Sequence, residues 1–302
     1  MSAKGYLSLS EYYRQRYGKK VYKVPIDAGF SCPNRTSRQE GGCVYCSGSG
    51  AAAAIAAENS HDIATQVIRN IAYLKRRFKA EKFVAYFQAY TNTVGTPAQL
   101  SELWQATLDQ SADFIGLSVG TRPDCLPDEI LDVLCEFSRR GYEVWVELGV
   151  QSLKDESLQF IRRGHSVATA LDSIARLRHR SLNVCVHVIF GLPTETLDEA
   201  VAHVQQLGEA GIDGIKIHML HILEGTDLAT LYHANPFPMP TRQEYAAAVA
   251  SAIATLPAHV VVQRLTGDAP AHEVLVAPLW IADKMATLRE IELAIERLYA
   301  VV

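Results

Sequence analysis

The stretch that runs from Ser31-Cys-Pro-Asn-Arg35 to Gly41-Gly-Cys-Val-Tyr-Cys46 contains three cysteines, Cys32, Cys43 and Cys46. A structural zinc site is normally closed by four Cys or His ligands. An iron–sulfur cluster that is held by only three thiolates keeps one iron free for an outside ligand. The three cysteines therefore predict a metal site with an open position, which indicates chemistry rather than a structural role.

The residues around the cysteines suit a cluster. Gly41 and Gly42 let the backbone turn tightly and point N–H groups at anionic sulfur. The spacing Cys-x2-Cys is nevertheless common to iron–sulfur and zinc sites. A zinc site whose fourth ligand is His61 or a distant residue therefore stays open as the alternative at this point.

The composition is that of an ordinary folded chain. Its 302 residues, 48% of them hydrophobic, are enough for one large domain or for a domain with an extension. Because no apolar run approaches the length of a membrane span and the first residues lack the apolar stretch of a secretory signal, we expect a cytoplasmic protein without a membrane partner. The other cysteines are scattered along the chain, at Cys125, Cys135 and Cys185. This pattern does not resemble a disulfide framework. The formal net charge of −4 argues against a protein that binds nucleic acid with its whole surface, but it is compatible with a local basic face.

Short β-rich runs alternate with amphipathic stretches along the chain. The strand-like runs cover residues 20–26, 83–88, 114–119, 143–148, 184–190 and 214–220. The helix-like stretches cover residues 63–78, 98–110, 127–140, 168–178 and 197–210. This alternation predicts an α/β fold with a parallel sheet and helical crossovers, in barrel or doubly wound form. The first strand leads into the cysteines and not into a GxGxxG turn, which disfavours a dinucleotide-binding fold.

Polar residues recur on one face of three of these strands. Alternate residues of a strand face opposite sides, so Glu147 and Gln151 share one face, and Lys216 and His218 share another. His187 likewise lies opposite the apolar residues of its strand. A parallel strand that is buried on both sides is normally apolar on both. The pattern predicts that this face lines a cavity, and the alternative is a polar layer that is satisfied internally.

The regular alternation ends after residue 220. The Pro-rich stretch Asn235-Pro-Phe-Pro-Met-Pro240 leads into a predicted helix over 241–256, followed by a strand-like run over 260–265 and a terminal helix over 282–300. We therefore predict a main domain over 1–240, with an N-terminal extension and the cysteine loop, and a C-terminal α/β extension over 241–302 that packs on it.

Seven short motifs, in order, resemble a known family. They are Phe30-Ser-Cys-Pro-Asn-Arg35, Tyr86-Phe-Gln88 with Thr91-Asn-Thr93, Gly120-Thr-Arg-Pro-Asp-Cys-Leu126, Glu147-Leu-Gly-Val-Gln-Ser152, Arg163-Gly-His165, Phe190-Gly-Leu-Pro193 and Gln263-Arg-Leu-Thr-Gly-Asp268. Together they resemble the YhcC/YtqA-like family of the radical S-adenosylmethionine (SAM) superfamily. The common cysteine spacing there is Cys-x3-Cys-x2-Cys, whereas this chain has Cys-x10-Cys-x2-Cys. That long first gap is similar to the one in the radical SAM domain of the elongator acetyltransferase catalytic subunit.

The resemblance implies a fold and a chemistry. The fold is a partial (β/α)6 TIM-like barrel, with a cysteine loop after the first strand and a 4Fe-4S cluster on Cys32, Cys43 and Cys46. In this superfamily the amino and carboxylate groups of SAM chelate the open iron, and an electron from the reduced cluster cleaves SAM to a 5′-deoxyadenosyl radical. A reducing protein such as flavodoxin or ferredoxin supplies the electron.

The resemblance also implies residues that contact SAM. Gln88 stands near the end of the second strand, where many relatives carry Gly-Gly-Glu for the methionine amino group. Glu147 and Gln151 match positions that approach the amino and ribose groups in related enzymes. Arg163 is expected to pair with the carboxylate, because a guanidinium fork fits a carboxylate bidentately. Because they share strand parity, His187, His218 and Lys216 are expected to contact SAM or substrate, and a satisfied structural role is the alternative.

Each assignment has a structural alternative. Arg163 is otherwise a surface helix charge, and Glu147 otherwise forms an internal ion pair with Lys216. Arg122 lies just past a strand end, where barrel active sites are built, and either holds a substrate anion or caps a neighbouring helix. Cys125 in the same loop is either a hydrogen donor or a small packed residue.

The favoured substrate is tRNA, because the elongator relative acts on wobble uridine. The stretch Tyr12-Tyr-Arg-Gln-Arg-Tyr-Gly-Lys-Lys-Val-Tyr22 interleaves basic and aromatic residues, which suits phosphates and bases, although a solvated helix face explains it equally well. Arg264 and Asp268 contact substrate if the extension covers the barrel mouth, and otherwise form an interdomain salt bridge. The alternatives are a small-molecule substrate or a non-catalytic, zinc-stabilised RNA-binding module.

Overall fold

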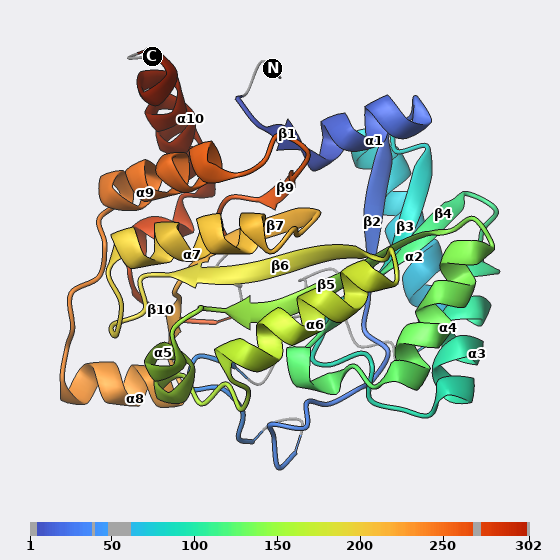
Figure 1. Cartoon of the computed structure of the whole chain (residues 1–302), viewed down its shortest axis with the longest axis horizontal. Helices are drawn as coiled ribbons and strands as arrows, with labels where there is room; N and C mark the ends of the chain where they lie inside the picture. Colours follow the sequence, from blue (N-terminus) through green and yellow to red (C-terminus); the bar gives the residue numbers. More distant parts are fainter. Residues whose placement is uncertain (1–4, 38–39, 48–61, 268–272, 301–302) are drawn as a thin grey trace.

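A curled, parallel sheet of eight strands forms the centre of the molecule. The computed structural model describes residues 5–37, 40–47, 62–267 and 273–300. The strand order is β1-β9-β7-β6-β5-β4-β3-β2, and every neighbouring pair is parallel. The strands are β2 (Val21–Ile26), β3 (Lys82–Phe87), β4 (Phe114–Thr121), β5 (Glu143–Gln151), β6 (Asn183–Phe190), β7 (Gly214–Met219), β9 (Val261–Arg264) and β1 (Leu7–Ser8). The six predicted strands are β2 to β7, and the predicted partial TIM-like barrel is confirmed (Figure 1).

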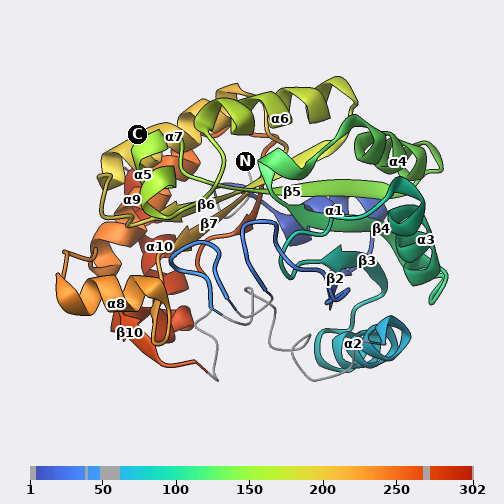
Figure 2. The ribbon, with the colours of Figure 1, turned by 90° about the horizontal axis from the view of Figure 1, so that it is seen from below.

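Helices cover the outer side of this half-barrel, as Figure 2 shows. The crossover helices are α2 (Ile63–Phe78), α3 (Pro97–Leu108), α4 (Asp128–Arg139), α6 (Val167–His179) and α7 (Leu197–Glu209). Their starts follow from local chemistry, since Thr96 and Thr196 each cap a helix in a capping box with a Gln or Glu three residues later. One βα unit after another adds one strand to the edge of the sheet.

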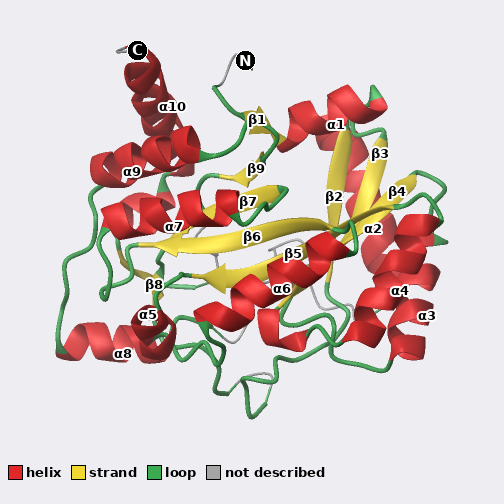
Figure 3. Cartoon of the chain, viewed as in Figure 1, coloured by secondary structure: helices red, strands yellow, loops and turns green. Residues whose placement is uncertain are grey.

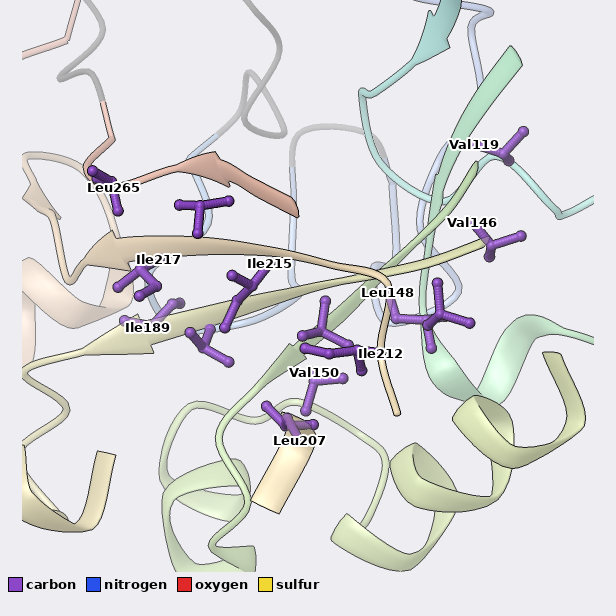
Figure 4. Close-up of a cluster of buried hydrophobic side chains, with 14 of the residues drawn as sticks. Val119, Val146, Leu148, Val150, Ile189, Leu207, Ile212, Ile215, Ile217 and Leu265 are labelled. Atoms are coloured by element: carbon purple, nitrogen blue, oxygen red, sulfur yellow. The ribbon is translucent and has the colours of Figure 1, made fainter. Parts of the chain in front are cut away.

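The outer core is apolar because alternate strand residues face the helices. Val146 and Leu148 of β5 and Ile215 and Ile217 of β7 are fully buried, and Figure 4 shows them gathered with Leu207 of α7. At roughly 25 cal/mol per Å² of apolar area removed from water, this layer is the main source of stability. The strand parity expected from the sequence is therefore confirmed for these strands.

Short elements without strong periodicity complete the fold (Figure 3). They are α1 (Leu9–Tyr17), α5 (Asp155–Phe160), α8 (Asp227–Ala234), β8 (Ile222–Leu223), β10 (Leu275–Ala277) and the 3-10 turns η1 (Pro123–Cys125) and η2 (Leu279–Ala282). Tyr13 of α1 is 1% exposed, and the Tyr12 ring meets the edge of Trp145 at 5.8 Å between centroids. Tyr12 and Tyr13 thus pack on the inner side of the sheet, near the start of its strands. Because Tyr13 is buried, its ring is unable to stack on a base.

The C-terminal extension continues the sheet. The predicted capped helix is α9 (Arg242–Thr255), with Thr241 as its capping residue, and the terminal helix is α10 (Lys284–Ala300). Strand β9 pairs with β7 on one side and with the N-terminal β1 on the other. The extension therefore shares the main sheet, and the division of the chain into 1–240 and 241–302 stays a prediction. Among the described residues, no helix has both the length and the apolar character needed to cross a membrane.

Candidate functional site

The cysteine loop follows β2 and is held by backbone hydrogen bonds to the end of α5 and the start of α8. The N–H of Val44 donates to the carbonyl of Ile161 at 3.1 Å, and the carbonyl of Val44 accepts from Leu228 at 2.8 Å. Gly41 and Gly42 have φ values of 78° and 96°, so the tight turn expected from the glycines is confirmed. The loop is therefore fixed at Val44, between the two cysteines of its Cys-x2-Cys pair.

Cys43 is buried beside a guanidinium. Arg163 Nη1 lies 3.6 Å from the Cys43 Sγ, and the amide Nδ2 of Asn34 lies at the same distance. Arg163 is only 6% exposed, and its Nε and Nη2 both donate to the Gly149 carbonyl, at 3.0 and 2.6 Å. Gly149 belongs to β5, so this strand fixes the direction in which the guanidinium faces the thiol.

The other two thiols also face arginines. Arg122 Nη1 lies 4.0 Å from the Cys32 Sγ, while its Nε and Nη2 make a bidentate ion pair with Asp124 at 2.9 and 2.8 Å. Arg35 donates to the Cys46 carbonyl at 3.1 Å. Burial raises the pKa of the Cys46 thiol, and the positive charge of Arg35 opposes that rise.

This donor set fits an anionic cluster. Two of the three thiols, those of Cys32 and Cys43, lie beside arginines that follow β4 and β5, and the charge of Arg35, in the loop itself, acts on the third thiol, that of Cys46. Cationic donors stabilise thiolates, and hydrogen bonds to sulfur tune the potential of an iron–sulfur cluster. Within the described residues no three His, Cys, Asp or Glu side chains converge on a point suited to a single metal ion. A cubane binds each thiolate to a different iron, so it does not require such convergence. His61 lies outside the described residues.

A charged layer lies across the inner face of the sheet, centred on Glu147. Its carboxylate is fully buried and accepts from five side chains: Lys216, Lys23 at 2.5 Å, Ser118 at 2.6 Å, the His187 Nε2 at 2.7 Å and Tyr86 at 2.9 Å. These residues come from strands β2 to β7, so the layer ties six strands together. The internal ion pair with Lys216, the structural alternative for Glu147, is thus present.

Burial and charge set the protonation states in this layer. Burial alone would raise the pKa of Glu147, but Lys216 and Lys23 outweigh it and hold the pKa well below its usual value. Burial, reinforced by Lys216, lowers the pKa of His187 to about 4. Glu147 is therefore an anion at neutral pH, and His187 is a neutral imidazole that donates Nε2–H to it.

The predicted SAM-contacting residues fall into two groups. Gln88 follows β3 and Gln151 ends β5, so both stand at the carboxyl edge of the sheet with the cysteine loop. Glu147 and His187 lie together in the charged layer. Arg163 joins the cysteines, and its burial excludes the alternative of a surface helix charge. The SAM contacts themselves stay predictions.

Some residues of the site were not singled out from the sequence. Lys23 and Tyr86 complete the charged layer, and Asn34 and Arg35 lie beside the cysteines. Lys23 did carry a signal, because it is a charged residue opposite the buried Val24 in a strand-like run. Asn34 and Arg35 stand in the motif Phe30-Ser-Cys-Pro-Asn-Arg35, but their roles could not be assigned, since contacts in an irregular loop follow no period.

Comparison with known proteins places this geometry in a family. The Radical SAM superfamily model matches residues 32–207, and the Radical_SAM C-terminal domain model matches residues 212–297. The protein YtqA of Bacillus subtilis is 35% identical over 296 residues, which cover 97% of this chain and 90% of YtqA. A tRNA uridine(34) acetyltransferase of Methanocaldococcus infernus is 32% identical over 162 residues, or 52% of this chain and 29% of that protein.

The fold is similar to that of a solved structure as well. The archaeal Methanocaldococcus infernus Elp3 with an N-terminal deletion superposes with a TM-score of 0.63 at 22% identity. The match covers 72% of this chain and 55% of that structure. At this identity the likeness concerns the fold alone.

Proposed function

Because this chain belongs to the radical SAM superfamily of enzymes, we propose that Cys32, Cys43 and Cys46 hold a 4Fe-4S cluster at which SAM is reductively cleaved. When bound, the cluster supplies one electron to SAM, and the cleavage yields a 5′-deoxyadenosyl radical that abstracts hydrogen from the substrate. The observation that carries the proposal is a loop of three thiols at the carboxyl end of the strands, in which Cys32 and Cys43 lie beside Arg122 and Arg163 and the charge of Arg35 acts on Cys46. Three ligands leave one iron open for SAM.

In this proposal, the chain's own residues hold the cluster and orient SAM. Arg122, Arg163 and Arg35 neutralise the thiolates, which lowers the cost of holding an anionic cluster beside a partly buried loop. We propose Gln88 and Gln151 as SAM contacts, because both stand at the edge of the sheet where the loop lies. The sequence also predicts SAM contacts for Arg163, Glu147 and His187. Each of these side chains already makes the hydrogen bonds described above, so each would have to contact SAM in addition to its present partners.

For the substrate we propose a wobble uridine of tRNA. The support is the relative named as a tRNA uridine(34) acetyltransferase, which matches about half of this chain. The exposed Arg14 on α1 and the Lys75, Arg76 and Arg77 cluster at the end of α2 offer basic side chains for a phosphate backbone. A small-molecule substrate remains the second candidate, and the net charge of −4 favours it.

We further propose a reducing protein, such as a flavodoxin or ferredoxin, as electron donor, and a cytoplasmic location. The six cysteines all lie in the described part of the chain and are free thiols, which suits a reducing compartment.

Two measurements test this function. Anaerobically reconstituted protein with SAM and dithionite is expected to form 5′-deoxyadenosine, and the Cys43→Ala variant is expected to form none, because two thiolates do not hold the cluster. Nucleoside mass spectrometry of tRNA from cells with and without the protein is expected to differ at a modified uridine. Full activity of the variant would refute the ligand assignment, and an unchanged tRNA profile would refute the tRNA substrate.

A further inference from the structure

The last long strand of the sheet carries a β-bulge that turns two polar side chains inward. On β9, Val262 packs in the outer core, and the next residue paired with β7 is Arg264, opposite Lys216. Gln263 is the extra residue, and its Oε1 accepts from Lys23 at 2.6 Å on the inner side. A bulge re-aims side chains in this way. Gln263 and Arg264 therefore both face the charged layer, although they are consecutive.

The inner face then carries more positive than negative charge. Lys23 and Lys216 share the single carboxylate of Glu147. Glu143, the other acidic residue of β5, is engaged near the strand's start with Arg16 at 3.1 Å. The cations facing the layer are Arg16, Lys23, Lys216 and Arg264, and the anions are Glu143 and Glu147. Two positive charges are left without a counter-charge among these groups.

Arg264 is the cation without a partner. Within residues 5–37, 40–47, 62–267 and 273–300 it makes no hydrogen bond or ion pair, although it is half-buried. Its backbone pairs with that of Lys216, and His218 lies two residues further along the same face of β7, which places Arg264 next to both. Asp268, predicted with Arg264 to contact substrate, lies outside the described residues. An unpaired guanidinium among other cations is held there at an electrostatic cost, which an anion would remove.

His218 stands beside it as a neutral donor. Burial, reinforced by Arg264, holds the pKa of His218 well below its usual value, so the ring is uncharged at pH 7. Its ring centroid lies 5.7 Å from that of His187, and it makes no hydrogen bond within the described part of the chain. A neutral imidazole retains one N–H, which is a suitable donor to an anionic oxygen.

His218 and Arg264 both lie at the carboxyl end of their strands. His218 is the penultimate residue of β7, and Arg264 is the last residue of β9. Active sites of parallel barrels lie at this carboxyl end. Arg264 and His218 belong to β9 and β7, whereas Arg122 and Arg163 beside the cysteines follow β4 and β5 on the other side of β6, so the two cationic groups come from different parts of the sheet.

We propose that Arg264 and His218, with Lys216 beneath them, bind an anionic group, a phosphate or a carboxylate, of the molecule that this enzyme modifies. The guanidinium fork provides two parallel N–H donors to such a group, and the imidazole provides a third. The description of the ligand as the substrate rests on the proposed function, whereas the existence of the anion site does not.

Isothermal titration with inorganic phosphate, and separately with malonate, tests the site on the anaerobically reconstituted full chain. Chloride is adjusted to keep the ionic strength constant. We expect saturable binding of at least one of the two anions at one site per chain, weakened at least tenfold by Arg264→Gln and weakened less by Arg264→Lys, which keeps the charge but loses the fork. The matched control is Arg297→Gln on α10, whose side chain is 72% exposed and which is expected to bind as the wild type does.

Several results would overturn the proposal. One is that neither anion binds saturably. Another is that folded Arg264→Gln protein binds the anion as tightly as the wild type does. A third is that SAM competes completely with the anion, which would make this the SAM carboxylate site. Competition by unmodified tRNA assigns the anion to an RNA backbone, and competition by nucleoside phosphates alone assigns it to a small substrate; both support the site. The titration needs neither reductant nor SAM. A wild-type protein that binds phosphate and forms no 5′-deoxyadenosine would thus separate failure of the proposed function from failure of this site.

Discussion

Replacing Arg163 is expected to change the reduction potential of the cluster. The guanidinium is buried, both of its other donors are committed to the Gly149 carbonyl, and Nη1 lies 3.6 Å from the Cys43 sulfur. A fixed positive charge at this position stabilises the reduced, more negative cluster. The sequence-based prediction for Arg163 was instead a contact with the SAM carboxylate.

The size of the effect follows from Coulomb's law. The added electron spreads over the cluster, so a separation of about 7 Å and an effective dielectric constant of about 20 give an interaction of about 2 kcal/mol. For a one-electron couple this corresponds to about 100 mV, since a tenfold change in the equilibrium constant is 59 mV. We therefore expect the midpoint potential of Arg163→Gln to fall by about 30 to 100 mV, because water entering the site screens part of the loss. Arg163→Lys keeps the charge and is expected to fall by less.

The assay is a redox titration followed by electron paramagnetic resonance, without SAM, with iron and sulfide counted per chain. Arg162→Gln is the matched control, because this neighbouring side chain is 60% exposed and pairs with Asp227. A normal potential in Arg163→Gln at full cluster content would refute the reasoning. If Arg163→Gln has a normal potential and a raised KM for SAM, the result would instead support the contact with the SAM carboxylate that the sequence predicts.

Three other substitutions test the surrounding structure. Cys43→Ala is expected to lower iron and sulfide content several-fold with little change in helix content by circular dichroism, and full content would exclude Cys43 as a ligand. Glu147→Gln leaves two buried lysines without their counter-charge and is expected to cost about 3 to 5 kcal/mol of unfolding free energy at pH 7. Because the pKa of Glu147 is lowered in the folded state, its contribution is present above the unfolded value near 4.5 and is lost as the pH falls toward the folded pKa. The gap in melting temperature between wild type and Glu147→Gln should therefore narrow below about pH 4.5, and a constant gap would contradict the ion pairing. Tyr13→Ala is expected to cost about 3 to 5 kcal/mol, whereas Arg14→Ala on the exposed side of the same helix should cost under about 0.5 kcal/mol; equal costs would contradict the packing of α1.

The fold was predictable because its strands and helices are long and periodic. Six strands and five crossover helices follow from hydrophobic spacing, and the inward parity of Glu147, His187 and Lys216 follows from alternation alone. The inward packing of α1 was not predicted, because its basic and aromatic residues are equally compatible with a solvated helix face and with a surface for nucleic acid. Only the packing of Tyr12 against Trp145, and of Tyr13 against Val21 and Val84, shows that these rings face the interior.

The site was predictable in its residue types and less so in its contacts. Three cysteines in a turn-rich loop indicate a metal site from spacing, but the sequence contains no signal that pairs Cys32 with Arg122 or Cys43 with Arg163, which lie 90 and 120 residues apart. Likewise, the bulge that turns Arg264 inward depends on strand register between β7 and β9, which no local pattern specifies.

The central claim is that the three-cysteine loop holds a cluster that cleaves SAM. The most direct measurement is one anaerobic reconstitution in which metal, acid-labile sulfide and 5′-deoxyadenosine are counted in the same sample after reduction with SAM. The account predicts about four iron and four sulfide per chain together with 5′-deoxyadenosine. Stoichiometric zinc without sulfide, and no 5′-deoxyadenosine, would contradict it.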